Sequence, residues 1–446
     1  MTSRPGAARI RRPAARSAPS DRRFAVLAAA DSRRRFLIEL FRAGLAAVDG
    51  RARVRAALGG RGDLRDAWVV AAGKAAGTMA LGALDALGSR LTRALVVARD
   101  GDFGSVLEQD PRVRCIAGGH PVPNAGSLEA GGAALAMARA AAAGQPVILL
   151  VSGGASSLLE CPVDGVTLED LQRVGRWALA SGLPIEGVNA LRRRLSRVKD
   201  GRLAAAFGHC RAEGYFMSDV PGDDPALVGS GLLAASASAP PSGAVLPAWL
   251  VSLLGRGTAP PAAGPRIPVR CIGRIEDAMD AVEQQARVGG WQVTRPAERL
   301  DGDAVAAAEE AGAWLAAGPP GLLLRGGETT VRLPPSPGRG GRNQHLALAA
   351  AVRIRGLDGC LLLAAGTDGI DGDTPDAGAL VDGRSVERGE DAGLDAAACL
   401  ARADSGRFLE ASGDLVHTGP TGTNVGDLLL GLRCDVGHSQ SDGPSM

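Results

Sequence analysis

The sequence predicts an α/β protein with parallel, doubly wound architecture, and three observations support this fold class. Short apolar runs alternate with segments of helical periodicity, a pattern typical of a parallel sheet covered by helices. Several runs end in glycine, serine or lysine, as expected where ligands bind at the carboxyl ends of strands. A segment rich in glycine and proline, residues 255–268, lies between two such patterns and is predicted to be a linker.

The first pattern contains the clearest alternation of strands and helices. Strands are predicted at residues 66–73, 93–99, 113–118 and 146–151, and helices at 74–87, 127–142 and 167–181. Thr167 and Asp170 open the last helix with the spacing of a capping box. The strands at 66–73 and 146–151 place Lys74 and Ser152 at the sheet edge where ligands bind.

The second pattern begins after the linker. Helices are predicted at residues 275–290, 303–318 and 343–354, strands at 291–296 and 360–366, and a hairpin at 321–333 that turns at Gly326 and Gly327. We therefore expect one domain at residues 24–254 and a second at 269–434.

Composition excludes several classes of function. The net charge of +2 over 446 residues favours no nucleic acid, and no apolar run approaches the roughly 18 residues of a membrane span. Seven cysteines without a CxxC pair fit reduced thiols in a cytoplasmic protein. Residues 1–23 carry seven arginines and are expected to be a disordered basic extension, with a transit peptide as the alternative. Residues 435–446 are expected to be a tail, and the protein a monomer or homodimer.

Only two of the 50 basic residues are lysines, Lys74 and Lys199. In so arginine-rich a chain, a lysine that remains indicates a need for a compact, flexible charge. Lys74 begins a helix directly after a predicted strand, and we expect its ammonium to reach a ligand cleft. Lys199 lies in the segment LRRRLSRVKDGR. It has two possible interpretations there, a solvated helix end or a functional position.

Six segments combine glycine with small polar residues beside apolar runs: AAGKAAG, VSGGASSLL, FMSDVPGDDP, GGRNQ, GTDGIDGDTPDAGA and TGPTGTN. Glycine-rich backbone beside a helix N-terminus can form a nest for phosphate. The residues that fit this role are Ser152, Gly153, Gly154, Ser156 and Ser157. A plain strand-to-helix turn with serine caps is the alternative for any one such loop.

Carboxylates are concentrated in two of these loops. The aspartates involved are Asp219, Asp223, Asp224, Asp368, Asp371, Asp373 and Asp376. Such clusters can hold Mg²⁺ or stabilise their own turns, and we expect one or two to face a metal or a substrate hydroxyl. Arg192 and Arg342 lie near such loops and could clamp a carboxylate or a phosphate.

Two familiar nucleotide fingerprints are not matched. A Walker A loop needs Ser or Thr after its lysine, but Ala75 follows Lys74. The segment GSGLLA, residues 229–234, imitates a dinucleotide-binding turn but leads into ASASAPPSG rather than a helix.

Together the loops resemble the class II glycerate 2-kinase family, also called the MOFRL family and often named hydroxypyruvate reductase. The matching segments run in order along the chain: GKAAGTMA, GGHPVPN, VSGGASSLL, NALRRRLSRVKDGRLA, SDVPGDDPALVGSG, GGETTV, GGRNQ, GTDGIDGDTPDAGA and TGPTGTNVGDL. The resemblance implies a Rossmann-like first domain, a smaller second domain and an active site in the cleft between them. It also implies phosphorylation of D-glycerate on the 2-hydroxyl with ATP and Mg²⁺.

The resemblance also implies roles for particular residues. Catalysis is expected from Lys74, Arg342 and Asp219. Substrate binding is expected from Lys74, Arg192 and Asp368, and metal binding from Asp219 and Asp223. Binding of nucleotide or phosphate is expected from Ser152, Gly153, Gly154, Ser156, Ser157, Gly326, Gly327, Glu328 and Asn343.

Three positions depart from the family's pattern: Arg325 before GGETTV, His345 after GGRNQ, and SGLL at residues 230–233. They bear on substrate and rate more than on reaction class. The alternative function is an NAD(P)H-dependent hydroxypyruvate reductase, which needs a dinucleotide-binding turn. A third is a non-catalytic sensor of phosphorylated metabolites, which would not need the acidic loops.

Overall fold

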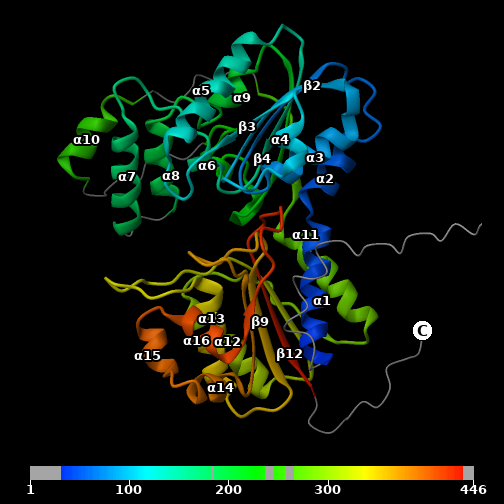
Figure 1. Cartoon of the computed structure of the whole chain (residues 1–446), viewed down its shortest axis with the longest axis vertical. Helices are drawn as coiled ribbons and strands as arrows, with labels where there is room; N and C mark the ends of the chain where they lie inside the picture. The colour runs from blue at the N-terminus through cyan, green and yellow to red at the C-terminus, as the bar shows by residue number, and fades with distance from the viewer. Residues whose placement is uncertain (1–31, 182–184, 237–245, 258–265, 435–446) are drawn as a thin grey trace, which may run out of the picture.

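The computed structural model describes residues 32–181, 185–236, 246–257 and 266–434. This part of the chain forms two α/β lobes, each built on a six-stranded sheet (Figure 1). The predicted extension, the predicted tail and residues 258–265 of the predicted linker lie outside the described residues. None of the described helices combines the length and apolar character needed to cross a membrane.

The sheet of the first lobe is parallel throughout, as the sequence predicts. Its strands follow the order β3-β2-β1-β4-β5-β6, and the order along the chain reverses between β1 and β4. Ligands bind at such a reversal, outside the carboxyl ends of the strands. The strands are β1 (Ala67–Ala72), β2 (Leu91–Ala98), β3 (Val113–Ala117), β4 (Pro146–Val151), β5 (Arg211–Met217) and β6 (Val269–Gly273).

Local sequence explains where the helices of the first lobe begin. Thr167 Oγ1 accepts from Asp170 N at 3.1 Å and the Asp170 carboxylate accepts from Thr167 N at 2.9 Å, which confirms the predicted capping box. The helices of this lobe are α2 (Gly50–Leu58), α3 (Ala76–Leu87), α4 (Ser105–Gln109), α5 (Ala125–Ala140), α6 (Ala155–Leu158), α7 (Leu168–Ala180), α8 (Ile185–Arg194), α9 (Arg202–Ala206) and α10 (Ala248–Leu254).

The sheet of the second lobe is mixed, with the order β11-β10-β9-β12-β8-β7, and only the β7–β8 pair is parallel. Its strands are β7 (Val293–Thr294), β8 (Gly321–Gly327), β9 (Cys360–Gly366), β10 (Gly378–Asp382), β11 (Leu415–Val416) and β12 (Asp427–Arg433). Its helices are α11 (Ile275–Val288), α12 (Ala304–Ala317), α13 (Arg342–Arg353), α14 (Ser385–Asp391), α15 (Ala396–Ala401) and α16 (Ser405–Ser412).

The predicted hairpin at residues 321–333 is wrong. β8 remains extended to Gly327 and pairs with β12 and β7 instead of with a strand that follows it. Consecutive leucines at 322–324 are all buried, so β8 needs cover on both faces, which an interior position in the sheet supplies.

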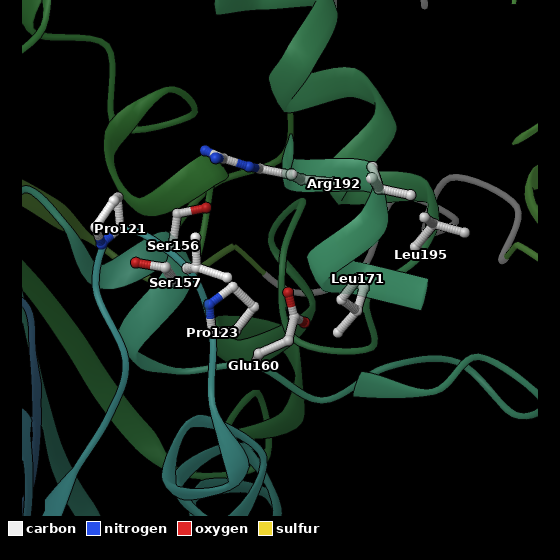
Figure 2. A pocket seen from close by; sticks show the side chains of 11 residues that line it. Pro121, Pro123, Ser156, Ser157, Glu160, Leu171, Arg192 and Leu195 are labelled. Atoms are coloured by element: carbon white, nitrogen blue, oxygen red, sulfur yellow. The ribbon is translucent and has the colours of Figure 1, made fainter. Parts of the chain in front are cut away.

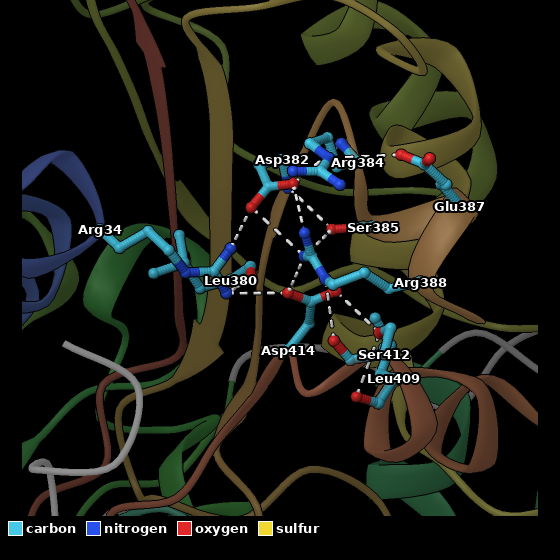
Figure 3. A network of polar contacts seen from close by, with 10 residues as sticks. All are labelled: Arg34, Leu380, Asp382, Arg384, Ser385, Glu387, Arg388, Leu409, Ser412 and Asp414. Carbon is cyan, nitrogen blue, oxygen red and sulfur yellow. Dashed lines mark hydrogen bonds and ion pairs between the residues drawn. The ribbon is translucent and has the colours of Figure 1, made fainter. Parts of the chain in front are cut away.

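Helix α1 (Ser32–Ala47) packs on the second lobe although it precedes the first in sequence. It lies beside α11 (Figure 1) and buries an apolar face. Its Arg34 donates to Leu380 O at 2.6 Å and to Asp414 Oδ1 at 2.8 Å, and it also pairs with Asp382 (Figure 3). Arg388 pairs with the same two aspartates, so a network of charges anchors α1 to β10.

The sheets divide the chain differently from the predicted boundaries. β6 follows the predicted linker, yet it is the edge strand of the first sheet beside β5. Helix α1, expected in the first domain, lies on the second. The largest apolar cluster contains residues of both lobes, including Val69 of β1 and Leu322 of β8. Glycine and proline mark a loop, but they do not determine which sheet the next strand joins.

Candidate active site

The ends of strands from both sheets contribute to one cluster of charged side chains. Lys74 and Asp219 follow β1 and β5, while Glu328 and Asp368 follow β8 and β9. Asp427 is the first residue of β12, which runs antiparallel to β8 and β9 and therefore starts where those two strands end. Sheet topology thus brings together residues that are far apart in the sequence.

Lys74 connects the two lobes. Its Nζ donates to Asp368 Oδ2 at 2.7 Å, and only 19% of the Lys74 side chain is exposed. Its backbone N–H donates to Gly153 O at 2.9 Å, which holds it against the loop after β4. Burial favours the neutral acid of Asp368, but the Lys74 ammonium outweighs it and lowers the pKa of Asp368. The two residues predicted to bind substrate from opposite domains are therefore in direct contact.

Asp219 extends the cluster toward the first sheet. It accepts a hydrogen bond of 2.9 Å from Asn424 Nδ2, which belongs to the loop before β12. Gly153 leaves room for this contact, because a Cβ there would lie 1.8 Å from Asp219 Oδ2. Burial raises the pKa of Asp219 and the charge of Lys74 opposes the shift. A carboxylate with a raised pKa is a stronger base.

Arg342 is held between two carboxylates at the start of α13. Its Nε and Nη2 donate to Asp427 at 2.6 Å and 3.1 Å, and its Nη1 lies 2.5 Å from Glu328 Oε1. Burial opposes the charge of Arg342, but the two carboxylates outweigh it and raise its pKa. Burial and the neighbouring carboxylates Asp427 and Asp219 raise the pKa of Glu328, although its side chain is still 46% exposed. Glu328 can therefore contact a ligand.

The loop after β4 is the predicted phosphate site. Ser152 Oγ accepts from Ala75 N at 3.0 Å, which ties this loop to the one that carries Lys74. Ser157 Oγ donates to Gly154 O at 3.3 Å, and Ser156 Oγ lies 2.7 Å from Ser230 Oγ. Because the serine hydroxyls already have partners, a phosphate would rely on the backbone N–H groups of this loop. Phosphate binding here stays a prediction.

Packing accounts for several residues that were predicted to bind nucleotide. A Cβ on Gly326 would come within 2.5 Å of α11, and one on Gly327 within 2.0 Å of a carbonyl oxygen. Asn343 is buried, and its backbone N donates to Asp371 at 3.1 Å, which caps α13. Their role toward nucleotide stays a prediction, and Glu328 is the member of the GGETTV segment whose side chain joins the cluster.

The prediction missed His120, Asn424 and Asp427. His120 lies in GGHPVPN and the other two in TGPTGTNVGDL, so the segments that carry the resemblance contained the signal. Burial, together with Lys74 and other nearby cations, lowers the pKa of His120 to about 3. Its imidazole is therefore neutral at physiological pH and can act only as a neutral donor or acceptor.

Two basic residues of the first lobe lie away from the interlobe contacts. Arg192 lines a pocket with Ser156 and Ser157 (Figure 2). Lys199 is fully buried, with 0% of its side chain exposed, and it pairs with Glu160. The alternative that Lys199 is a solvated helix end is therefore wrong. The residue is buried, and it lies in the connection between α8 and α9.

The three departures from the family's pattern make local contacts. Arg325 donates to Glu310 at 2.7 Å, and His345 Nδ1 lies 3.0 Å from Ser405 Oγ. In residues 229–234 no strand leads directly into the glycines, and Gly231 O accepts from Gly201 N at 2.6 Å. That segment is a packed loop rather than a dinucleotide-binding turn.

Two family models match different parts of this chain. Residues 36–245 match a domain of unknown function, DUF4147, and residues 321–427 match the MOFRL family. The D-glycerate 2-kinase of Thermotoga maritima is 32% identical over 397 residues, which cover 82% of this chain and 90% of that protein. An Agrobacterium vitis protein, provisionally named hydroxypyruvate reductase, is 37% identical over 378 residues, 81% of this chain and 97% of that protein. The crystal structure of the T. maritima glycerate kinase superposes with a TM-score of 0.77 at 31% identity and covers 90% of this chain and 100% of that one.

Proposed function

The chain belongs to the MOFRL family of glycerate 2-kinases, and from that premise we propose that it transfers the γ-phosphoryl group of ATP to the 2-hydroxyl of D-glycerate. The products are 2-phosphoglycerate and ADP. The observation that supports this proposal is the contact between Lys74 and Asp368 in a cluster that also contains Asp219 and Arg342. Phosphoryl transfer depends on alignment and charge neutralisation more than on covalent help, and this cluster supplies both.

Each charged group has a distinct task in the proposed reaction. The 2-oxygen of glycerate forms a bond to the γ-phosphorus while the bond from that phosphorus to the bridging oxygen of ADP breaks. Lys74 and Arg342 neutralise charge on the phosphoryl oxygens, and Asp368 orients the Lys74 ammonium. Asp219 accepts the proton of the 2-hydroxyl, since burial raises its pKa and strengthens it as a base.

We propose that the nucleotide phosphates bind along the loop of Ser152, Gly153 and Gly154 in the first lobe. Backbone N–H groups in a glycine loop after a parallel strand suit phosphate oxygens. From the second lobe, Glu328 and Asn343 complete the proposed nucleotide site beside Arg342.

A magnesium ion that arrives with ATP is part of the proposal. Among the described residues, no group of three or more His, Cys, Asp or Glu is arranged to hold a metal. The resemblance offers Asp219 and Asp223 as its ligands, but Mg²⁺ takes one or two carboxylates together with water and phosphate oxygens, so Asp223 would suffice and Asp219 would remain the base. Asp223 also lies 3.8 Å from Arg274. When bound, the ion neutralises charge on the β- and γ-phosphates.

Product identification tests the proposal and separates it from the reductase alternative. The purified protein is incubated with D-glycerate, ATP and Mg²⁺, and the product is identified by NMR. We expect 2-phosphoglycerate, whereas 3-phosphoglycerate alone would contradict the regiochemistry. Incubation with hydroxypyruvate and NADH is expected to leave the NADH absorbance unchanged, and its oxidation would favour the reductase.

A further inference from the structure

A pocket in the first lobe lies beside the Pro121–Pro123 segment (Figure 2), and its other lining residues belong to or adjoin α6, α7 and α8. Apolar walls come from residues including Leu171, Val174 and Leu195. Its polar lining consists of Ser156, Ser157, Glu160 and Arg192. Polar recognition of a ligand in this pocket therefore depends on four side chains. Their existing hydrogen bonds show which donors and acceptors remain free for a ligand.

Arg192 supplies an uncompensated positive charge. Within the described residues it makes no hydrogen bond or ion pair, and Glu160 is the only charge that raises its pKa against the lowering by burial. Its guanidinium extends over Ser156 in the pocket (Figure 2). A half-buried cation without a partner is costly, and a bound anion relieves that cost.

Glu160 does not repel such an anion, because its charge is already neutralised. Lys199 pairs with its Oε2, while Oε1 accepts from Ser196 Oγ at 2.5 Å and from Cys161 N at 2.9 Å. Lys199 is fully buried. The pair makes the floor of the pocket neutral and leaves carboxylate oxygens that can accept further hydrogen bonds.

The two serines offer acceptors rather than donors. Ser230 Oγ donates to Asn189 Oδ1 at 2.8 Å, so its proton is used there and Ser156 must donate across the 2.7 Å contact to Ser230. Ser157 donates to Gly154 O. The pocket therefore presents one cationic donor, Arg192, together with several acceptor oxygens.

We propose that this pocket is the acid-binding subsite of the kinase, with the substrate carboxylate on Arg192 and its 3-hydroxyl on the acceptor oxygens of Ser156 and Glu160, which leaves the 2-hydroxyl for Asp219. Phosphate binds where several N–H or O–H donors converge, and the side chains here do not offer them. A hydroxy acid has the matching groups, one anionic end and hydroxyl donors. The assignment rests on the proposed function and moves Ser156 and Ser157 from the phosphate site to the acid site.

The pocket adjoins the proposed site of transfer. Gly154 precedes Ser156 by two residues, and a Cβ on Gly154 would lie 3.0 Å from His120 Cδ2 and 3.1 Å from Lys74 Cγ. Pro121, which lines the pocket, directly follows His120. An acid held by Arg192 is thus placed beside the loop that also packs against Lys74.

Ligand binding to Arg192→Gln tests the subsite without requiring turnover. Calorimetric titration with D-glycerate alone is expected to show affinity reduced about 10- to 100-fold, the scale of a lost hydrogen bond to a charged group. Arg192→Lys keeps the positive charge but lacks the planar, paired donors of the guanidinium. It should therefore bind D-glycerate more tightly than Arg192→Gln and more weakly than the wild type. The non-hydrolysable ATP analogue AMP-PNP should bind both variants as it binds the wild type. Arg176→Gln, on the exposed face of α7, is the control and should bind D-glycerate normally.

The outcomes separate the subsite from the function. Loss of D-glycerate affinity with AMP-PNP binding retained supports the subsite, even if the wild type shows no kinase activity. Unchanged D-glycerate affinity in Arg192→Gln, loss of AMP-PNP affinity instead, or a wild type that does not bind D-glycerate would each overturn it. Propionate, which has the carboxylate without hydroxyls, should bind the wild type at least about 10-fold more weakly than D-glycerate, since it lacks the hydroxyl contact with Ser156 and Glu160. Equal binding would remove Ser156 and Glu160 from the assignment.

Discussion

The Lys74 ammonium and the Asp368 carboxylate lie 2.7 Å apart, although 294 positions separate them in the sequence. The contact joins the end of β1 in the first lobe to the end of β9 in the second. The Lys74 ammonium lowers the pKa of Asp368, so the carboxylate stays ionised and holds the lysine in place. In the proposed reaction, a lysine positioned in this way contacts the phosphoryl group during its transfer.

Replacing Lys74 with Arg should lower kcat by at least about 10²-fold, the scale of one lost transition-state contact. Arginine keeps the charge, but it presents a planar fork where the proposed transfer uses a compact ammonium with rotatable donors. The melting temperature should change little, since the cationic partner of Asp368 is retained. Steady-state kinetics and thermal denaturation measure the two effects.

The control for Lys74→Arg is Arg114→Lys, which exchanges the same two residue types at an exposed position. The Arg114 side chain is 61% exposed. It should leave both quantities unchanged. Turnover of Lys74→Arg near that of the wild type would remove Lys74 from the catalytic residues. Lys199 is unsuitable as a control because it is fully buried.

Exchanging Asp219, Asp223 and Asp368 individually for Asn should identify which carboxylates support turnover with Mg²⁺. Asp219→Asn should show the largest loss, about 10²- to 10⁴-fold in kcat, because it removes the proposed base. Asp368→Asn should lower kcat by releasing Lys74, and Asp223→Asn should raise the Mg²⁺ concentration needed for half-maximal rate. If all three variants keep the turnover and Mg²⁺ dependence of the wild type, the acidic loops have no catalytic role.

The buried imidazole of His120 should make folding stability depend on pH. Burial and nearby cations lower its pKa to about 3 in the folded protein, against about 6.5 when unfolded. The unfolded chain therefore takes up the proton first as pH falls. The stability contributed by neutral His120 is fully present above pH about 6.5 and is lost progressively down to about 3, at up to about 1.4 kcal/mol per pH unit.

Urea denaturation of the wild type and His120→Gln between pH 7 and pH 4 measures this term. Other titrating groups are common to both proteins, so the difference in their free energies of unfolding isolates residue 120. The wild type should lose stability relative to the variant as the pH falls. A difference that stays constant across this range would show that His120 titrates normally.

Removing one member of the buried Lys199–Glu160 pair should be strongly destabilising. Lys199→Met leaves the Glu160 charge buried without its partner, which typically costs about 3–5 kcal/mol of unfolding free energy. The double variant Lys199→Met with Glu160→Gln removes both charges and should recover much of the loss. Chemical denaturation measures each variant, and a single variant as stable as the wild type would contradict the burial of this pair.

Local pattern alone was sufficient for many features of this protein. Apolar runs and helical periodicity predicted a parallel first sheet and its strands β1 to β4, because neighbouring residues determine burial on both faces of a strand and the amphipathicity of a helix. Strands β5 and β6 were not predicted. The capping box at Thr167 was predictable for the same reason, since its hydrogen bonds join residues three apart. Lys74 and Ser152 were placed at the ligand edge of the sheet because they directly follow strands.

Only the tertiary structure decided which distant residues meet. Helix α1 and strand β6 joined lobes that their positions in the chain did not indicate, because pairing and packing depend on the order of strands in each sheet. Lys199 proved to be buried, since its counter-ion Glu160 comes from a different segment. Asp427 entered the site because antiparallel pairing sets the start of β12 beside the ends of β8 and β9. Such contacts are formed by long-range register and burial, which local sequence composition does not encode.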